Sequence, residues 1–73
     1  MNHKSAIASS MRGTRASKYK SQREAANAVG ISAETIANYE SGETCPNVLN
    51  AWALADYYGV SLDDLVGRRQ TAT

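Results

Sequence analysis

This 73-residue sequence contains one histidine and one cysteine, two side-chain types that enzymes often use for acid-base or nucleophilic chemistry. The lone histidine, His3, and the lone cysteine, Cys45, lie far apart in the chain, so neither has an obvious catalytic companion. The adjacent carboxylates Asp63 and Asp64 are better explained as first-turn acids of a short helix than as a catalytic pair. No metal-ligand spacing and no glycine-rich phosphate loop occurs. We therefore expect no catalysis, no metal site and no cofactor.

The charges of the chain are separated into two blocks along the sequence. Residues 1–23 hold six Lys or Arg side chains and no acid, whereas residues 24–67 hold all seven acids and no Lys or Arg. This asymmetry favours a protein whose one end faces a polyanion, although a solvated basic arm would give the same pattern.

The remaining composition is typical of one small folded domain. The chain is 42% hydrophobic and 21% charged, which is too apolar for a disordered segment and sufficient for a single core. The single cysteine, the lack of a charged-then-apolar leader and the lack of a long apolar run predict a cytoplasmic protein with no membrane partner.

Glycine and serine residues divide the chain into helices. Four glycines follow segments of helical periodicity, where a residue that adopts positive φ ends a helix. Ser21 and Ser61 begin capping boxes, Ser32 is a third cap, and Asn47 directly follows a proline where a fourth helix should start. No strand-length stretch alternates apolar and polar residues. The sequence therefore predicts an all-α fold with five helices, over residues 5–18, 22–29, 33–41, 47–58 and 62–66.

Helical spacing predicts the buried face of each helix. The expected core consists of Ile7, Met11, Ala25, Ala26, Val29, Ile36, Tyr39, Val48, Ala51, Leu54, Ala55, Tyr58, Leu62 and Leu65. The domain is expected to span residues 5–67, between a flexible basic N-terminus over 1–4 and a flexible tail over 68–73, because nothing in these ends ties them down.

The turn between the second and third predicted helices is only a few residues long, so the two helices must cross steeply. This is the arrangement of a helix-turn-helix. Ala26 lets the two helices approach, Gly30 supplies the turn conformation, and larger apolar residues fill the inside of the angle.

Several short motifs occur in register along this region and beyond it. They are Ser21-Gln22, Ala25-Ala26, Gly30-Ile31-Ser32, Thr35-Ile36, Tyr39-Glu40 and Gly42, followed by Pro46, Val48, Leu54-Ala55-Asp56, Gly59-Val60-Ser61, Leu62-Asp63 and Leu65. With these motifs the chain resembles the lambda-repressor and Cro family, the XRE type of helix-turn-helix protein, from about residue 11 to residue 67. The resemblance implies a compact five-helix domain that binds double-stranded DNA as a small transcriptional regulator, expected to be a repressor. It also implies a bacterial or phage-encoded protein that is associated with the nucleoid when bound.

The resemblance further implies that the third helix, residues 33–41, lies in the major groove with its first residues at base edges. Asn38 can bond an adenine edge at two positions, Glu34 can accept from a cytosine amino group, and alanine can touch a thymine methyl. Glu34 equally fits stabilisation of the positive helix N-terminus, and Ala33 equally fits a neutral surface position. The expected base contacts are Ala33, Glu34, Thr35, Ala37 and Asn38.

The family's phosphate-clamping position is occupied by Gln22, at the N-terminus of the second helix. Arg15 and Glu40 match an ion pair that the family often places between the first and third helices, so we expect them to be structural. Further phosphate contacts are expected from Lys18, Lys20, Arg23, Ser41, Thr44 and Asn47.

The sequence departs from the family at three places, one of which is Ala25, which is smaller than the family's usual leucine. Tyr19 and Lys20 stand where glycine and leucine are usual, just before the second helix. The third helix and the loop after it contain no Lys or Arg, which predicts weak binding per subunit with a shallow salt dependence.

Two kinds of protein partner stay open. The resemblance implies a homodimer on a palindromic operator, and Leu49, Trp52 and Tyr57 form a possible dimer patch. Placing Trp52 in the core and Tyr57 simply over the surface fits the sequence as well. The alternative function is a protein-binding module, antitoxin-like or anti-repressor-like, in which the acids Glu34, Glu40 and Glu43 face a basic partner.

Overall fold

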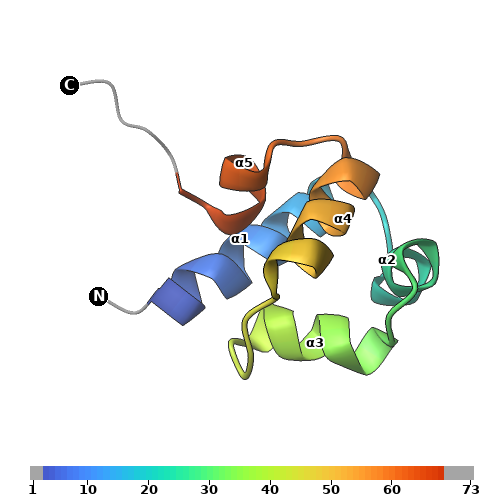
Figure 1. Cartoon of the computed structure of the whole chain (residues 1–73), viewed down its shortest axis with the longest axis horizontal. Coiled ribbons are helices and arrows are strands. Elements are labelled where there is room, and N and C mark those ends of the chain that lie inside the picture. The colour runs from blue at the N-terminus through green and yellow to red at the C-terminus, as the bar shows by residue number, and fades with distance from the viewer. Residues whose placement is uncertain (1–2, 69–73) are drawn as a thin grey trace.

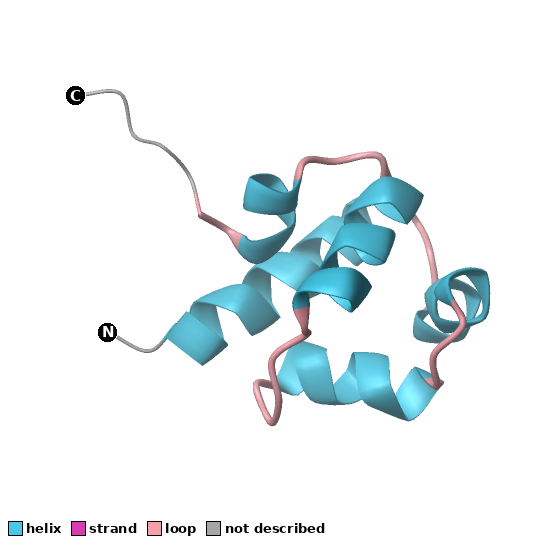
Figure 2. Ribbon diagram, in the orientation of Figure 1, coloured by secondary structure: helices cyan, strands magenta, loops and turns pink. Residues whose placement is uncertain are grey.

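The computed structural model describes residues 3–68, which form five helices joined by short loops (Figures 1 and 2). Within this range there is no strand, and the prediction of an all-α fold with five helices is confirmed. No helix of the same range is long and apolar enough to cross a membrane. The helices are α1 (His3–Ser17), α2 (Gln22–Val29), α3 (Ala33–Ser41), α4 (Val48–Tyr58) and α5 (Leu62–Val66).

The bounds of α2, α3 and α5 coincide with the predicted ones, whereas α1 and α4 differ. Helix α1 begins at His3, so His3 and Lys4 belong to a helix and not to the expected flexible N-terminus. Helix α4 begins after Asn47, because the Asn47 side chain is the cap and accepts from the backbone N–H of Asn50 at 2.8 Å. Apart from these differences and Arg68, the ends predicted to be flexible lie outside the described residues.

Each of the last four helices begins at a polar cap and ends at a glycine with positive φ. In the capping box of α2, Ser21 Oγ accepts from the N–H of Glu24 at 3.0 Å, and the Glu24 carboxylate accepts from the N–H of Ser21 at 2.9 Å. Helix α1 ends differently: two residues after Ser17 lies Tyr19, whose φ of 58° is the only positive φ of a non-glycine residue between 3 and 68. The helix ends of this chain are therefore set locally by side-chain caps and by left-handed residues.

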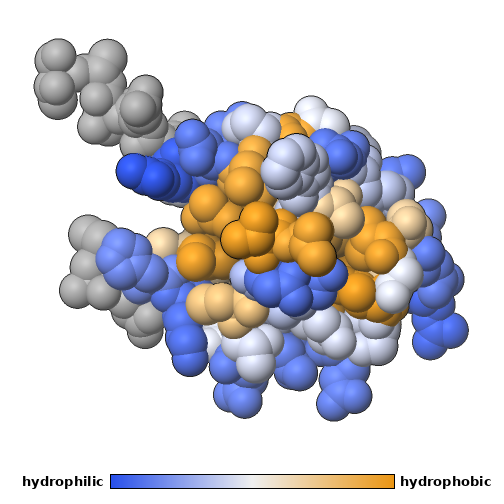
Figure 3. Space-filling view, in the orientation of Figure 1, coloured by the Kyte–Doolittle hydropathy of each residue, from blue (hydrophilic) through white to orange (hydrophobic). Residues whose placement is uncertain are grey.

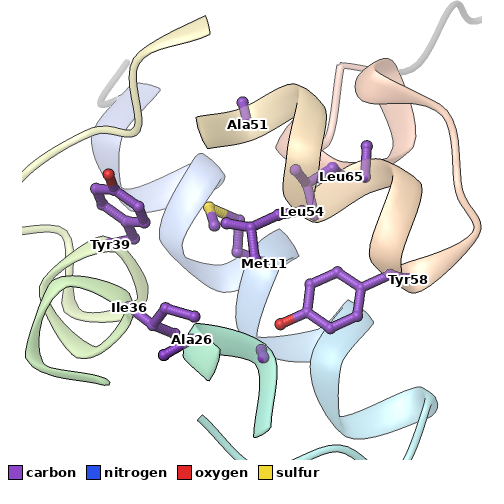
Figure 4. Packing of buried hydrophobic residues seen from close by; sticks show 10 residues of the cluster. Met11, Ala26, Ile36, Tyr39, Ala51, Leu54, Tyr58 and Leu65 are labelled. Atoms are coloured by element: carbon purple, nitrogen blue, oxygen red, sulfur yellow. The ribbon is translucent and has the colours of Figure 1, made fainter. Parts of the chain in front are cut away.

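The core lies between all five helices, and its largest fully buried side chains are Met11, Ile36, Leu54 and Leu65. Helix α1 packs against α3 and α5, α2 packs against α3 and α4, and α4 packs against α5. Figure 4 shows Met11 of α1 between Leu54 of α4 and Ile36 of α3. Met11 therefore packs α1 into the centre of the core. Burying side chains of this size stabilises a fold by about 1.5–3 kcal/mol each.

The prediction that Val48 and Leu62 belong to the core is wrong, because both side chains are exposed. Val48 is 69% exposed and Leu62 is 39% exposed. Each is the first residue of its helix, where the helical spacing extends the apolar stripe beyond the surface that neighbouring helices cover. Ile7 and Val29 are partly buried and pack against the core, and Ala8, which helical spacing did not select, is buried in α1.

Candidate nucleic-acid interface

Helices α2 and α3 form the helix-turn-helix, and their connection is fixed by backbone hydrogen bonds. Gly30 has a φ of 79°, and the N–H groups of Gly30 and Ile31 both donate to the carbonyl of Ala26, at 2.9 and 3.0 Å. Ser32 then starts α3 by accepting from the N–H of Thr35 at 3.0 Å. As a result α3 lies along one edge of the molecule (Figure 1).

The outward face of α3 carries three of the five expected base contacts. Ile36 and Tyr39 are buried on the inner face, so the helical spacing places Glu34, Ala37 and Asn38 on the opposite face. Glu34 is exposed, and the other two are partly buried. The Asn38 carbonyl accepts from the N–H of Glu43 at 3.0 Å, so Asn38 supports the following loop through its backbone.

The other two expected base contacts have structural neighbours. Thr35 Oγ1 lies 2.7 Å from Ser32 Oγ, so its hydroxyl takes part in the cap of α3. Ala33 is partly buried and packs against the core. Both lie at the start of α3, and their contact with bases stays a prediction.

Glu40 holds α3 against α1 and α2 although its side chain is almost fully buried. Its Oε2 accepts from Arg15 Nε at 2.8 Å, and its Oε1 accepts from Arg15 Nη2 at 3.0 Å. Gln22 Nε2 also donates to Oε1, at 3.1 Å. The hydrogen bonds to Glu40 raise the pKa of Arg15 above its ordinary value, and burial, reinforced by the charge of Glu40, raises the pKa of Tyr58 to about 12. Each oxygen of the buried carboxylate thus has a donor, as a buried charge requires.

The predicted phosphate clamp, Gln22, is part of this cluster. Its amide group links the N-terminus of α2 to α3 through Glu40, which fixes where the side chain lies. A side-chain amide carries two hydrogens, so one hydrogen bond to Glu40 leaves a second hydrogen for a phosphate oxygen.

Arg12 and Arg15, two cations of the basic block over residues 1–23, stabilise the fold through hydrogen bonds to backbone carbonyls. Arg12 Nη1 donates to the backbone carbonyl of Glu40 at 2.8 Å, and Arg15 Nη1 donates to the carbonyl of Lys20 at 2.9 Å. This role of Arg12 was not predicted from the sequence. Its spacing of three residues from Arg15 places both on one face of α1, which is the signal that would have found it.

The expected phosphate contacts form two groups. The first lies just before α2 and in its first turn, and the second runs from the last residue of α3 to the cap of α4. Lys18 and Arg23 are exposed. Lys20 Nζ lies 5.9 Å from the ring centroid of Tyr57, a cation-π contact that directs it toward the end of α4. In the second group the Ser41 hydroxyl donates to the Asn38 carbonyl at 3.2 Å, Thr44 is exposed, and Asn47 caps α4.

An apolar surface, here called the α4 patch, consists of Val48, Leu49 and Trp52. Leu49 is 79% exposed and Trp52 is 61% exposed. Figure 3 shows an apolar area over α4, the helix nearest the viewer. A shallow pocket next to Trp52 extends the surface toward Leu62. Tyr57 does not join this patch, because it packs against the core with its ring 5.3 Å from that of Tyr58.

The residues considered for enzyme chemistry are dispersed over the surface. Cys45 is exposed in the loop before α4, and Asp63 and Asp64 lie in the first turn of α5, where Ser61 accepts from the N–H of Asp64 at 3.0 Å. Between residues 3 and 68, no group of three or more His, Cys, Asp or Glu side chains is placed to hold a metal ion.

In this five-helix domain a short turn joins α2 to α3, which lies at an edge of the molecule. This arrangement defines the class of helix-turn-helix domains, in which the second helix of the motif, here α3, reads DNA. A family model described as helix-turn-helix matches residues 11–65. The chain belongs to this family, which is the lambda-repressor-like, XRE-type helix-turn-helix family.

Two curated proteins are similar to the chain, and both are named cryptic phage CTXphi transcriptional repressor RstR. The protein from Vibrio cholerae serotype O1 is 40% identical over 52 residues, which cover 71% of this chain and 46% of that protein. A second, from Vibrio cholerae, is 33% identical over 65 residues, which cover 89% of this chain and 59% of that protein. The chain thus spans about half the length of the curated relatives it matches. No solved structure matches it significantly.

Proposed function

We propose that this chain binds a specific double-stranded DNA site as a small transcriptional regulator, and that its regulatory effect is repression. The observation that carries the proposal is the position of α3, which presents Glu34, Ala37 and Asn38 at an edge of the molecule while Glu40 anchors the helix from behind. The two similar proteins named as transcriptional repressors support the same function.

In the proposed complex α3 lies in the major groove and its outward side chains read base edges. Asn38 has the amide geometry that pairs with the two polar atoms of an adenine edge, Glu34 accepts from a cytosine amino group, and Ala37 contacts a thymine methyl. Ala33 and Thr35 contribute at the N-terminal end of the helix. Phosphate contacts from Gln22 and from the two groups on either side of α3 fix the register.

We further propose that two copies bind a palindromic operator with half-sites about one helical turn apart, in the bacterial cytoplasm at the nucleoid. The α4 patch supports a homodimer, because three large apolar side chains on one helix face are costly to leave in water. Two copies also double the number of phosphate contacts, which compensates for the few cations of one subunit.

Selection of bound fragments from random and genomic DNA at two salt concentrations tests this function. The expected result is an enriched motif with two-fold symmetry, bound with a Kd of about 10⁻⁸ to 10⁻¹¹ M at physiological salt. Flat micromolar binding to every sequence would contradict the proposal.

A second candidate function is a protein-binding module that uses the same fold. The exposed acids Glu34, on α3, and Glu43, in the loop after α3, favour this second function because their negative charges repel the phosphates of DNA. The same selection separates the two functions, since a module of this kind enriches no DNA motif at either salt concentration.

A further inference from the structure

Tyr19 has a positive backbone φ, which among the other residues between 3 and 68 occurs only at glycines. It lies two residues after the last residue of α1, with a φ of 58°, whereas the residues of positive φ that follow α2, α3, α4 and α5 are all glycines, with φ between 73° and 85°. A side chain with a Cβ is penalised in this left-handed region, and a bulky aromatic one is unusual there.

Packing of the Tyr19 side chain does not offset this strain. Its side chain is 93% exposed. The hydrogen bonds that close α1 run from the N–H of Tyr19 to the carbonyl of Ala16 at 3.1 Å and from the N–H of Lys20 to the carbonyl of Arg15 at 3.3 Å. Glycine would make the same bonds. A strained residue that the fold does not require points to a role in binding.

The surroundings of Tyr19 indicate which ligand its ring meets. Lys18 and Lys20 flank it in the sequence, and Arg23 is exposed in the first turn of α2. The N-terminus of α2, which also favours anions, begins three residues later. Arg15 Nη1 holds the carbonyl of Lys20 at 2.9 Å, so this turn is tied to the ion pair that positions α3. A polyanion drawn to the cations would lie within reach of the Tyr19 hydroxyl.

We propose that Tyr19 contacts the DNA backbone and that its phenolic hydroxyl donates a hydrogen bond to a phosphate oxygen beside the one held at Gln22. This inference rests on the proposed DNA-binding function. Tyrosine is among the neutral side chains that donate to DNA phosphates, and such contacts position a protein without reading sequence. The left-handed backbone then directs an aromatic ring outward at a turn where the family usually has glycine.

Three variants test the proposal on the selected operator fragment, with affinity and Tm measured for each. Tyr19→Gly relieves the strain, so it should raise Tm by about 4–8 °C and lower affinity about fivefold. Tyr19→Phe keeps the ring and the backbone, so it should leave Tm unchanged and lower affinity by the same factor. The control is Gly13→Ala in α1, where a Cβ meets nothing within 4 Å; it should raise Tm similarly and leave affinity unchanged.

Salt dependence adds a second measurement. The factor by which Tyr19→Phe lowers affinity should be the same at low and high salt, because a neutral donor releases no counterion. Lys18→Ala, in contrast, should make the salt dependence of binding shallower. Wild-type affinity in both Tyr19 variants would overturn the inference and leave the DNA-binding function intact. Failure of the wild-type chain to select any DNA site would overturn both.

Discussion

Arg15 and Glu40 form a two-point ion pair between α1 and α3, with Nε to Oε2 at 2.8 Å and Nη2 to Oε1 at 3.0 Å. The side chain of Glu40 is 4% exposed and that of Arg15 is 19% exposed. A carboxylate this deeply buried is tolerated only while its donors stay in place. The pair therefore maintains the angle of α3 as well as the stability of the fold.

Removal of one partner of this pair should be severe. We expect Arg15→Met to lower the free energy of unfolding by about 3–5 kcal/mol, because it leaves the Glu40 carboxylate buried without its main counter-charge. A loss of that size is comparable with the whole stability of many small domains, about 5–15 kcal/mol. Urea unfolding followed by circular dichroism measures it.

The matched control is Arg23→Met, which removes an exposed cation and should change stability by no more than about 0.5 kcal/mol. The double variant Arg15→Met with Glu40→Met should recover much of the loss, since no unpaired charge is left behind. A single-variant loss below about 1 kcal/mol would contradict this account of the pair.

The helix bounds show what local sequence signals determine. Helices α2, α3 and α5 were predicted without error because a serine caps each start and a glycine follows each end. After α1, Tyr19 has the positive φ that a glycine has after the other helices, and the predicted bounds 5–18 differ from the observed His3–Ser17. Local caps are contained in a few neighbouring residues, and a sequence displays them directly.

The candidate site was less predictable because its contacts join distant segments. Helical spacing places Asn38 on the outward face of α3, but it says nothing of the hydrogen bond between Gln22 and Glu40 or of Lys20 over Tyr57. The exposure of Val48 likewise depends on where neighbouring helices stop. These features follow from tertiary packing and are absent from any one helix.

Asn38 offers a test of sequence readout. Asn38→Ala should reduce discrimination at one base position of the half-site by about 1–3 kcal/mol, because the amide is lost from the adenine edge. Stability should stay within about 0.5 kcal/mol, since Asn38 supports the following loop through its backbone carbonyl, which alanine retains. Competition binding against operators changed at one position measures the effect. An equal loss of affinity on every operator would mean that Asn38 contributes to affinity and not to sequence readout. The control is Asn27→Ala, on the exposed surface of α2.

The α4 patch offers a test of dimer formation. Leu49→Ser should shift sedimentation on the palindromic site from two bound copies toward one, because it removes a large apolar side chain from the proposed interface. It should leave the stability of the isolated domain unchanged within about 0.5 kcal/mol, since the side chain is mostly in water. Ala6→Ser, on the exposed surface of α1, serves as the control. Two copies bound equally well by the Leu49 variant would remove the α4 patch from the interface.

The capping box of α2 gives a pH dependence of known sign. The backbone N–H of Ser21 donates to the Glu24 carboxylate and lowers the pKa of Glu24 below its ordinary value of 4.5. A lowered pKa in the folded state stabilises the fold above pH 4.5, and this contribution disappears as the pH falls through the folded-state pKa. Wild-type protein should therefore be more stable than Glu24→Gln at pH 7, and the difference should vanish in acid. Unfolding curves at pH 7 and below pH 4 measure it, and a difference that grows in acid would contradict the assigned hydrogen bond.

The salt dependence of DNA binding should reveal how many cations touch phosphates. Arg12 and Arg15 are engaged with Glu40, which leaves Lys18, Lys20 and Arg23 as the predicted cationic contacts. Three neutralised phosphates give a slope of log K against log salt of about −3 per subunit, and five, with Arg12 and Arg15 added, would give about −4.5. Lys18→Ala should reduce the slope by about 1, whereas Arg12→Ala should lower stability and leave the slope unchanged. Titrations of the operator fragment at four salt concentrations measure these slopes, and a wild-type value of about −4.5 would mean that the arginines leave Glu40 to bind DNA.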